Sequence, residues 1–211
     1  MGINDIVIPK GIGFGEGGGR LGRLAGILTA FKAALVNPAI PEKTIVSPVA
    51  AGGGKVAVAA GNAQDGDQIA IGGVTYTWKT TLSTPAEPYE VLIGEDSSAA
   101  AGNLKKAINK ESTEGTNYGT GTVAHPQVSA TVSAGTVTLA AKVKGKAGNS
   151  IAVEFTPKDE GTSNVTTTAL SGGVDGTVGA KGAVCYSGGK IYISVGASTV
   201  SESNWKSADL A

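Results

Sequence analysis

The residues that carry most enzyme chemistry are scarce in this chain. Its 211 residues include one histidine, His125, and one cysteine, Cys185. A single cysteine excludes an intramolecular disulfide and any zinc site built from several thiolates. Aromatic residues make up only 5% of the sequence, so small and β-branched side chains must fill the core. We therefore expect no enzyme activity, no cofactor and no metal site.

Charge is also scarce, and it is balanced. The chain has 17 basic and 17 acidic residues, and charged residues total 16%, below the usual quarter. A neutral chain lacks the basic surface of a nucleic-acid-binding protein. No apolar run approaches the roughly 18 residues of a membrane-spanning helix, and the first residues lack a signal-peptide pattern. We expect no nucleic-acid partner, no membrane span, and synthesis in the cytoplasm.

Glycine is abundant, with 33 residues, about twice the average share. Together with the many Val, Ile and Thr residues, it indicates a turn-rich protein. The predicted fold class is α+β, mainly β. It comprises an antiparallel sheet module with one packed helix, an extended N-terminal arm with one helix, and a small C-terminal β hairpin piece.

Residues 1–54 are predicted to form the arm. Six of the nine residues 11–19 are glycine, and residues 21–36 then show the apolar spacing of a helix, which Asn37-Pro38 ends. Residues 13–18 match the G-x-G-x-x-G pattern of a dinucleotide site. Prolines interrupt the position where a second βαβ strand should follow, which favours a flexible attachment arm over a nucleotide site.

Residues 55–171 are predicted to form the β module. Its helix, residues 98–110, should be capped by Ser97 or Ser98, and a two-residue Gly72-Gly73 turn indicates a hairpin. The strands are predicted at 55–60, 68–71, 74–79, 89–93, 127–133, 136–143, 151–155 and 165–170. The helix should bury one apolar face made of Ala100, Ala101, Leu104, Ala107 and Ile108.

Residues 172–211 are predicted to form the C-terminal β piece. Its composition indicates a hinge at 172–176 and a hairpin of strands 183–186 and 190–195, with Trp205 closing over it. One hairpin in forty residues is marginally stable alone. This piece should therefore pack on a neighbour, and we expect a homo-oligomer, with a trimer as one option.

The candidate chemical groups each have an ordinary structural interpretation. His125 stands in a polar loop and should face solvent, while Cys185 alternates within a strand and should be a small buried apolar residue. Asp65-Gly66-Asp67 favours a turn over a calcium loop. The basic segment 142–146 could meet phosphate, but a solvated loop is the favoured interpretation.

Part of the chain resembles a known module. The residues that carry the resemblance are Asp65-Gly66-Asp67 through Gly72-Gly73-Val74-Thr75-Tyr76-Thr77-Trp78, Val91-Leu92-Ile93-Gly94, Asn103-Leu104 to Ile108-Asn109, Ala147-Gly148-Asn149-Ser150-Ile151, and Leu170-Ser171-Gly172-Gly173-Val174-Asp175-Gly176. They are similar to a module common in tailed-bacteriophage virion proteins. Residues 179–205 resemble short β segments that end many phage fibre and decoration chains.

The resemblance implies a non-enzymatic virion protein made in the host bacterial cytoplasm. A capsid decoration (cement) or head-fibre protein is favoured, bound through its arm to the major capsid protein. The arm contacts would be Leu24, Ile27, Leu28 and Phe31, although these residues could equally pack on the chain's own module. A tail or neck component is the alternative. A carbohydrate-binding module is a second alternative, and its stacking surfaces would be Trp78, Trp205, Tyr89 and Tyr118. Of these residues, Trp205 is the best candidate for exposure.

Overall fold

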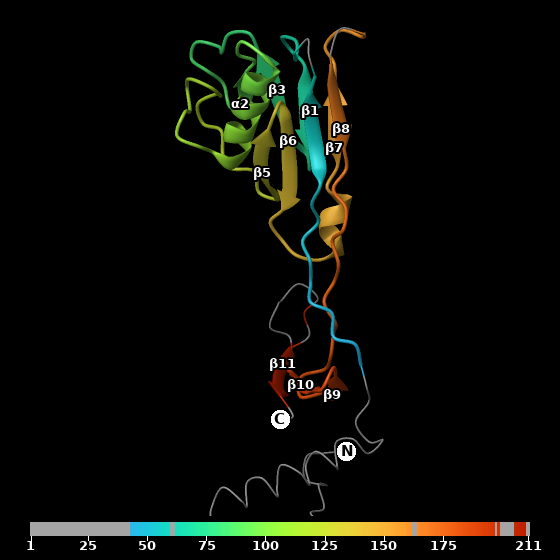
Figure 1. Cartoon of the computed structure of the whole chain (residues 1–211). Coiled ribbons are helices and arrows are strands. Elements are labelled where there is room, and N and C mark those ends of the chain that lie inside the picture. Colours follow the sequence, from blue (N-terminus) through green and yellow to red (C-terminus); the bar gives the residue numbers. More distant parts are fainter. Residues whose placement is uncertain (1–42, 60–61, 162–163, 197, 199–204, 210–211) are drawn as a thin grey trace, which may run out of the picture.

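The computed structural model describes residues 43–59, 62–161, 164–196, 198 and 205–209. The predicted helix 21–36 and the glycine-rich segment before it lie outside the described residues. Figure 1 shows a β module at one end and a small sheet at the other, with two chain segments running side by side between them. Within the described residues, the structure is mainly β with one α-helix and three small sheets.

The first sheet of the module is antiparallel throughout. Its order is β5 (Val128–Ser133), β6 (Thr136–Ala141), β1 (Gly54–Val58) and β8 (Val165–Thr168). β1 lies between strands that follow it by many residues, with Val56 opposite both Val137 and Thr167. Long-range pairing therefore organises this sheet.

The second sheet has the order β4 (Glu90–Leu92), β3 (Val74–Lys79), β2 (Gln68–Ile71) and β7 (Val153–Thr156). The β2–β3 hairpin turns at Gly72-Gly73, where both residues have positive φ, as a type I′ turn requires. β3 and β4 are parallel. The module thus contains two four-stranded sheets, whereas the sequence pattern predicted one.

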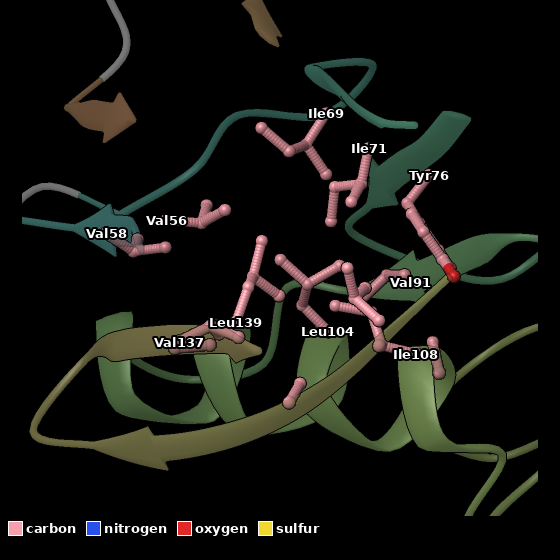
Figure 2. Close-up of a cluster of buried hydrophobic side chains, with 14 of the residues drawn as sticks. Val56, Val58, Ile69, Ile71, Tyr76, Val91, Leu104, Ile108, Val137 and Leu139 are labelled. Carbon is pink, nitrogen blue, oxygen red and sulfur yellow. The ribbon is translucent and has the colours of Figure 1, made fainter. Parts of the chain in front are cut away.

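Helix α2 (Ser97–Asn109) contacts both sheets through β5, β6, β1 and β4. Figure 2 shows apolar side chains from the strands and the helix pointing toward one another in a shared core. The predicted helix face is correct, because all five of its residues are buried. The predicted cap is wrong: the Asp96 carboxylate, not a serine, accepts the Ala99 N–H at 2.8 Å.

The small C-terminal sheet has the order β9 (Val184–Ser187), β10 (Lys190–Ser194) and β11 (Trp205–Asp209). All pairs are antiparallel, so β11 adds a third strand to the predicted hairpin. A short 3-10 helix, η2 (Lys146–Ser150), lies where the module meets the two connecting segments. For the described residues, the predicted fold class is confirmed: the chain is mainly β, with one packed helix and a small C-terminal β piece.

Candidate functional site

The two segments that join the module to the C-terminal sheet form a paired ribbon. We call residues 44–53 and 171–180 the stalk. Val49 and Val174 exchange two backbone hydrogen bonds of 2.8 and 3.0 Å, and Gly52 and Ser171 exchange two of 2.8 and 2.9 Å. The N–H of Thr177 donates to the Val46 carbonyl at 2.9 Å. Residues 172–176, which composition predicted to be a hinge, are therefore hydrogen-bonded to the segment that leads into β1.

The stalk continues the β1–β8 ladder without a change of register. Lys55 lies opposite Thr168, Gly52 opposite Ser171 and Val49 opposite Val174, so each step of three residues on one strand matches three on the other. The module and the stalk therefore share one long antiparallel pairing. This pairing holds the direction of the stalk relative to the module.

Burial along the stalk repeats every three residues rather than every two. In the first segment Pro48 and Ala51 are buried, as is Gly54 at the start of β1, while Val46 and Val49 are exposed. A strand alternates with a period of two, whereas a polyproline-II helix has three residues per turn. The stalk segments thus have the periodicity of the polyproline-II form although they continue a β ladder.

The second segment has the same period. Gly173 and Gly176 are buried and Gly179 is half-buried, and Leu170, just before the segment, is also buried. A Cβ at Gly173 would lie 2.5 Å from the Gly145 carbonyl oxygen and 2.8 Å from Asn149 Oδ1, and one at Gly179 would lie 2.4 Å from the Trp205 ring. Glycine is required at these two positions because neighbouring atoms leave no room for a side chain.

Sequence reasoning missed the stalk, although the signal was present. Glycine recurs at 173, 176, 179 and 182, a Gly-x-x spacing that indicates close approach at every third residue. Read as overall composition, these glycines suggest flexibility. Read by their spacing, they predict one tightly packed side of a polyproline-II-like segment.

The top of the stalk is held by the loop that precedes η2. The Gly145 N–H donates to the Val49 carbonyl at 3.0 Å, and the Asp175 carboxylate accepts the Lys146 N–H at 2.7 Å. The Asn149 side chain both donates to the Gly173 carbonyl and accepts its N–H, at 3.0 and 2.7 Å. The basic segment 142–146, expected as a solvated loop, thus joins the module to the stalk through its backbone.

The base of the stalk lies against the C-terminal sheet. The Lys43 N–H donates to the Tyr186 carbonyl at 2.9 Å, and the Lys43 ammonium donates to the Val178 carbonyl at 3.0 Å. The same ammonium lies 5.7 Å from the Trp205 ring centroid. The Trp205 indole N–H donates to the Thr177 carbonyl at 2.7 Å. Lys43, the first described residue, therefore lies at this base.

The predicted partner-binding residues Leu24, Ile27, Leu28 and Phe31 lie outside the described residues, as does the 13–18 glycine motif. Trp205, the predicted stacking residue, is half-buried and fixed by its indole hydrogen bond. Trp78 and Tyr118 are fully buried in the module core. Tyr89 packs edge-on against Tyr76, with ring centroids 5.6 Å apart. Trp78 and Tyr118 are therefore unavailable for stacking on a ligand.

His125 is fully buried, so the expectation that it faces solvent is wrong. Its Nδ1 accepts the backbone N–H groups of Gln127 and Val128, both at 3.1 Å, which places the ring proton on Nε2 for donation to the Ile71 carbonyl at 2.8 Å. Burial lowers the pKa of His125, and the nearby Lys142 acts in the same direction. The neutral ring holds the 111–126 loop against the β2–β3 hairpin.

The carboxylates of Asp65 and Asp67 stabilise a turn, as their sequence predicted. Asp65 accepts the Thr80 N–H at 2.8 Å, a bond that lowers the pKa of Asp65. Asp67 accepts the N–H groups of Gln64 and Lys158 at 2.7 and 3.0 Å. Across the described parts of the chain, no three His, Cys, Asp or Glu residues come together as a metal site would require.

Glu90 has a comparable role in the loop before β4. Burial by itself would raise the pKa of Glu90, but hydrogen bonds from Ser83 and the Glu87 N–H outweigh it and the pKa lies below its ordinary value. The Ser83 hydroxyl donates at 2.6 Å and its N–H at 2.9 Å. Glu90 therefore closes the 80–90 loop as a charged acceptor.

Cys185 is buried in β9, as its strand position predicted. Burial raises the pKa of its thiol, so little thiolate forms near neutral pH. None of the helices in the described residues has the length and apolar character needed to cross a membrane.

Comparison with known proteins gives no family assignment. No protein-family model, no curated protein and no solved structure matches this chain.

Proposed function

We propose that this chain is a non-enzymatic structural protein of a tailed-bacteriophage virion. In this proposal it is a capsid decoration or head-fibre protein whose N-terminal arm binds the major capsid protein. The module would project outward on the stalk, and the base would face the capsid.

One observation carries the proposal: the N-terminal arm starts at the end of the stalk farthest from the module. Lys43 bonds to β9, and β11 belongs to the same small sheet. An arm that starts there can lie on a surface while the module stays away from it. The stalk then sets the height of the module, which a single flexible linker would not do.

The contacts of the buried polar groups support a structural rather than a catalytic role. His125, Asp67 and Glu90 each accept backbone N–H groups of nearby residues, and Asp67 also accepts the N–H of the distant Lys158. A general acid or base needs free access to a substrate proton. These side chains are instead used to fix loops of the module.

The arm is tested by deleting residues 1–42, which leaves every described hydrogen bond of the stalk in place. Capsids of the encoding phage that lack this protein are mixed with the full chain or the deletion variant and sedimented. We expect the full chain to co-sediment and the deletion variant to stay in the supernatant. A variant with Leu24, Ile27, Leu28 and Phe31 all changed to Ser should also be lost from the pellet.

Thermal unfolding of the deletion variant is the folding control, and it should match that of the full chain. Equal binding by both proteins would refute attachment through the arm. Co-purification of the full chain with tails rather than heads would replace the decoration proposal by the tail or neck alternative.

The carbohydrate-binding alternative depends on Trp205. One ring is a small stacking surface, and Lys43 lies over this one. A glycan array probed with the full chain and with Trp205→Ala separates the proposals. Binding that Trp205→Ala abolishes would favour the carbohydrate module, and an array without signal would leave the decoration proposal as stated.

A further inference from the structure

Exposed apolar residues are concentrated away from the module. Among the described residues, nine large apolar side chains are exposed, and six of them lie on the stalk or in and next to the C-terminal sheet. Four belong to the stalk, where Val46, Val49, Val174 and Val178 are 42%, 50%, 38% and 44% exposed. We call these four residues the valine stripe.

The valine stripe follows from the geometry of the stalk. Val49 and Val174 lie directly opposite each other in the ladder. Val46 is one three-residue turn before Val49, so it has the same position relative to the paired segment. The inner positions take Pro, Ala and Gly and are covered by the chain itself. At the outer positions 46, 49 and 174 the residue is an exposed valine that no described residue covers, and Val178 is exposed four residues after Val174.

The stalk is almost without charge. Within residues 44–53 and 171–180 the one charged residue is Asp175, and its carboxylate accepts the Lys146 N–H. The neighbouring Lys43 ammonium is directed to the Val178 carbonyl and the Trp205 ring. The one charged stalk residue of each copy is thus already hydrogen-bonded, and no other charge within these stalk segments opposes the approach of a second identical stalk.

We infer that the valine stripe is the surface through which copies of this chain associate, with their stalks side by side and parallel. A two-stranded ribbon alone is marginally stable in water, and burial of the stripe on a neighbour would stabilise it. At the base, Ile193 in β10 and Val195 just after it are also exposed. In parallel stalks, the base residues of one copy lie next to the base residues of the other copy. In antiparallel stalks, they would lie next to the other copy's module. The inference does not depend on capsid attachment.

The first test measures the mass of the full chain by size-exclusion chromatography with light scattering. At micromolar concentration we expect an oligomer for the unmodified chain and a monomer for Val174→Asp, because each copy would place a carboxylate against its neighbours. Val123→Asp is the matched control, since Val123 is exposed at 53% on the module and far from the stalk in sequence. Val123→Asp should keep the oligomeric mass.

The second test determines how the stalks lie. In a Cys185→Ser background, Val46→Cys and Val49→Cys are oxidised separately. A disulfide requires Cα atoms about 4.4–6.8 Å apart. In parallel stalks each of these residues meets its own counterpart, so both variants should give covalent dimers. In antiparallel stalks only a residue at the twofold axis meets itself, so dimers from one variant alone would overturn the parallel arrangement. Val123→Cys should stay uncrosslinked.

Other occupants of the stripe give different results. A monomeric full chain overturns the inference, as does an oligomer that Val174→Asp leaves intact. In one such result the Val49→Cys variant is a monomer, and its introduced thiol reacts with maleimide only after residues 1–42 are deleted. The arm then covers the stripe. If that thiol becomes protected only when capsids are added, the stripe belongs to the capsid contact. Capsid binding is measured separately, so failure here leaves the attachment proposal to its own test.

Discussion

Gly173→Ala should weaken the stalk, whereas Gly52→Ala should leave it unchanged. Both glycines lie in the stalk, and neither has a positive φ. A methyl group at Gly173 would meet two atoms at distances below 3.0 Å, while one at Gly52 would find nothing within 4 Å. The pair therefore separates the effect of close approach from the effect of glycine itself.

The magnitude follows from the neighbours of Gly173. The Gly145 carbonyl, at 2.5 Å from the added Cβ, belongs to the backbone and cannot rotate away. Asn149 can move only by giving up its two hydrogen bonds to Gly173, worth about 0.5–1.5 kcal/mol each. Overpacking adds about 1–3 kcal/mol. We expect Gly173→Ala to lower the free energy that holds the stalk to the module by about 2–6 kcal/mol.

Hydrogen exchange measured by mass spectrometry is the suitable assay because it reports each segment separately. In Gly173→Ala, amides of residues 46–52 and 171–177 should exchange faster, while those of α2 keep their protection. Gly52→Ala should match the unmodified chain, or be stabilised by up to about 1 kcal/mol through a smaller unfolded-state entropy. Equal exchange in the two variants would refute the argument that packing selects glycine at position 173.

Three further predictions concern the module and the base. Leu104→Ala, at a fully buried position of α2, should lower the free energy of unfolding by about 2–5 kcal/mol. Gly102→Ala, on the same helix but with open space around the added methyl group, should raise the free energy of unfolding by about 1 kcal/mol. Chemical denaturation measures both changes. Because the pKa of His125 is lowered in the folded chain, the unfolded chain binds more protons, so the His125 contribution to stability should be complete above the ordinary pKa of 6.5 and fall as pH drops below it. In His125→Gln this dependence of the free energy of unfolding on pH should disappear. An unchanged dependence would assign it to other groups. Cys185 should react with a thiol reagent only after unfolding, and rapid reaction of the native protein would contradict its burial.

Local elements of the module could be predicted because their signals are local. The β2 and β3 strands were predicted with the bounds that the structure gives, since Gly72-Gly73 specifies the turn and alternation specifies the strands. Helix α2 was predicted to within one residue at each end, because its apolar spacing allows only one buried face. Here the period of the pattern and the geometry of the element agree.

Long-range arrangements could not be predicted in the same way. Nothing in the residues of β1 indicates that it pairs with both β6 and β8, and the division into two sheets depends on that pairing. The burial of His125 was missed because a polar residue in a polar loop looks solvated. The structure buries it because its ring bonds to three backbone groups, at Ile71, Gln127 and Val128. Such bonds depend on loop conformation rather than on any sequence period.

The candidate site was the least predictable part. The proposed arm contacts rest on helical spacing at residues 21–36 and stay a prediction. The stalk depends on two segments that are more than a hundred residues apart in sequence, and on a three-residue period that neither the helix nor the strand template contains. A search for Gly-x-x spacing would have found one of these segments, but not its partner.

The unbroken register between β1–β8 and the stalk has a mechanical consequence. Both segments of the stalk enter the same sheet through neighbouring, hydrogen-bonded strands, with Lys55 opposite Thr168 directly above Gly52 opposite Ser171. A force on the base is therefore shared by two strands that pull on the sheet in the same direction, and neither strand is peeled from the other. A single linker would suffice to tether the module, but it would let the module rotate freely. The paired stalk instead restrains both the distance and the orientation of the module relative to the base, which the decoration role proposed above would require.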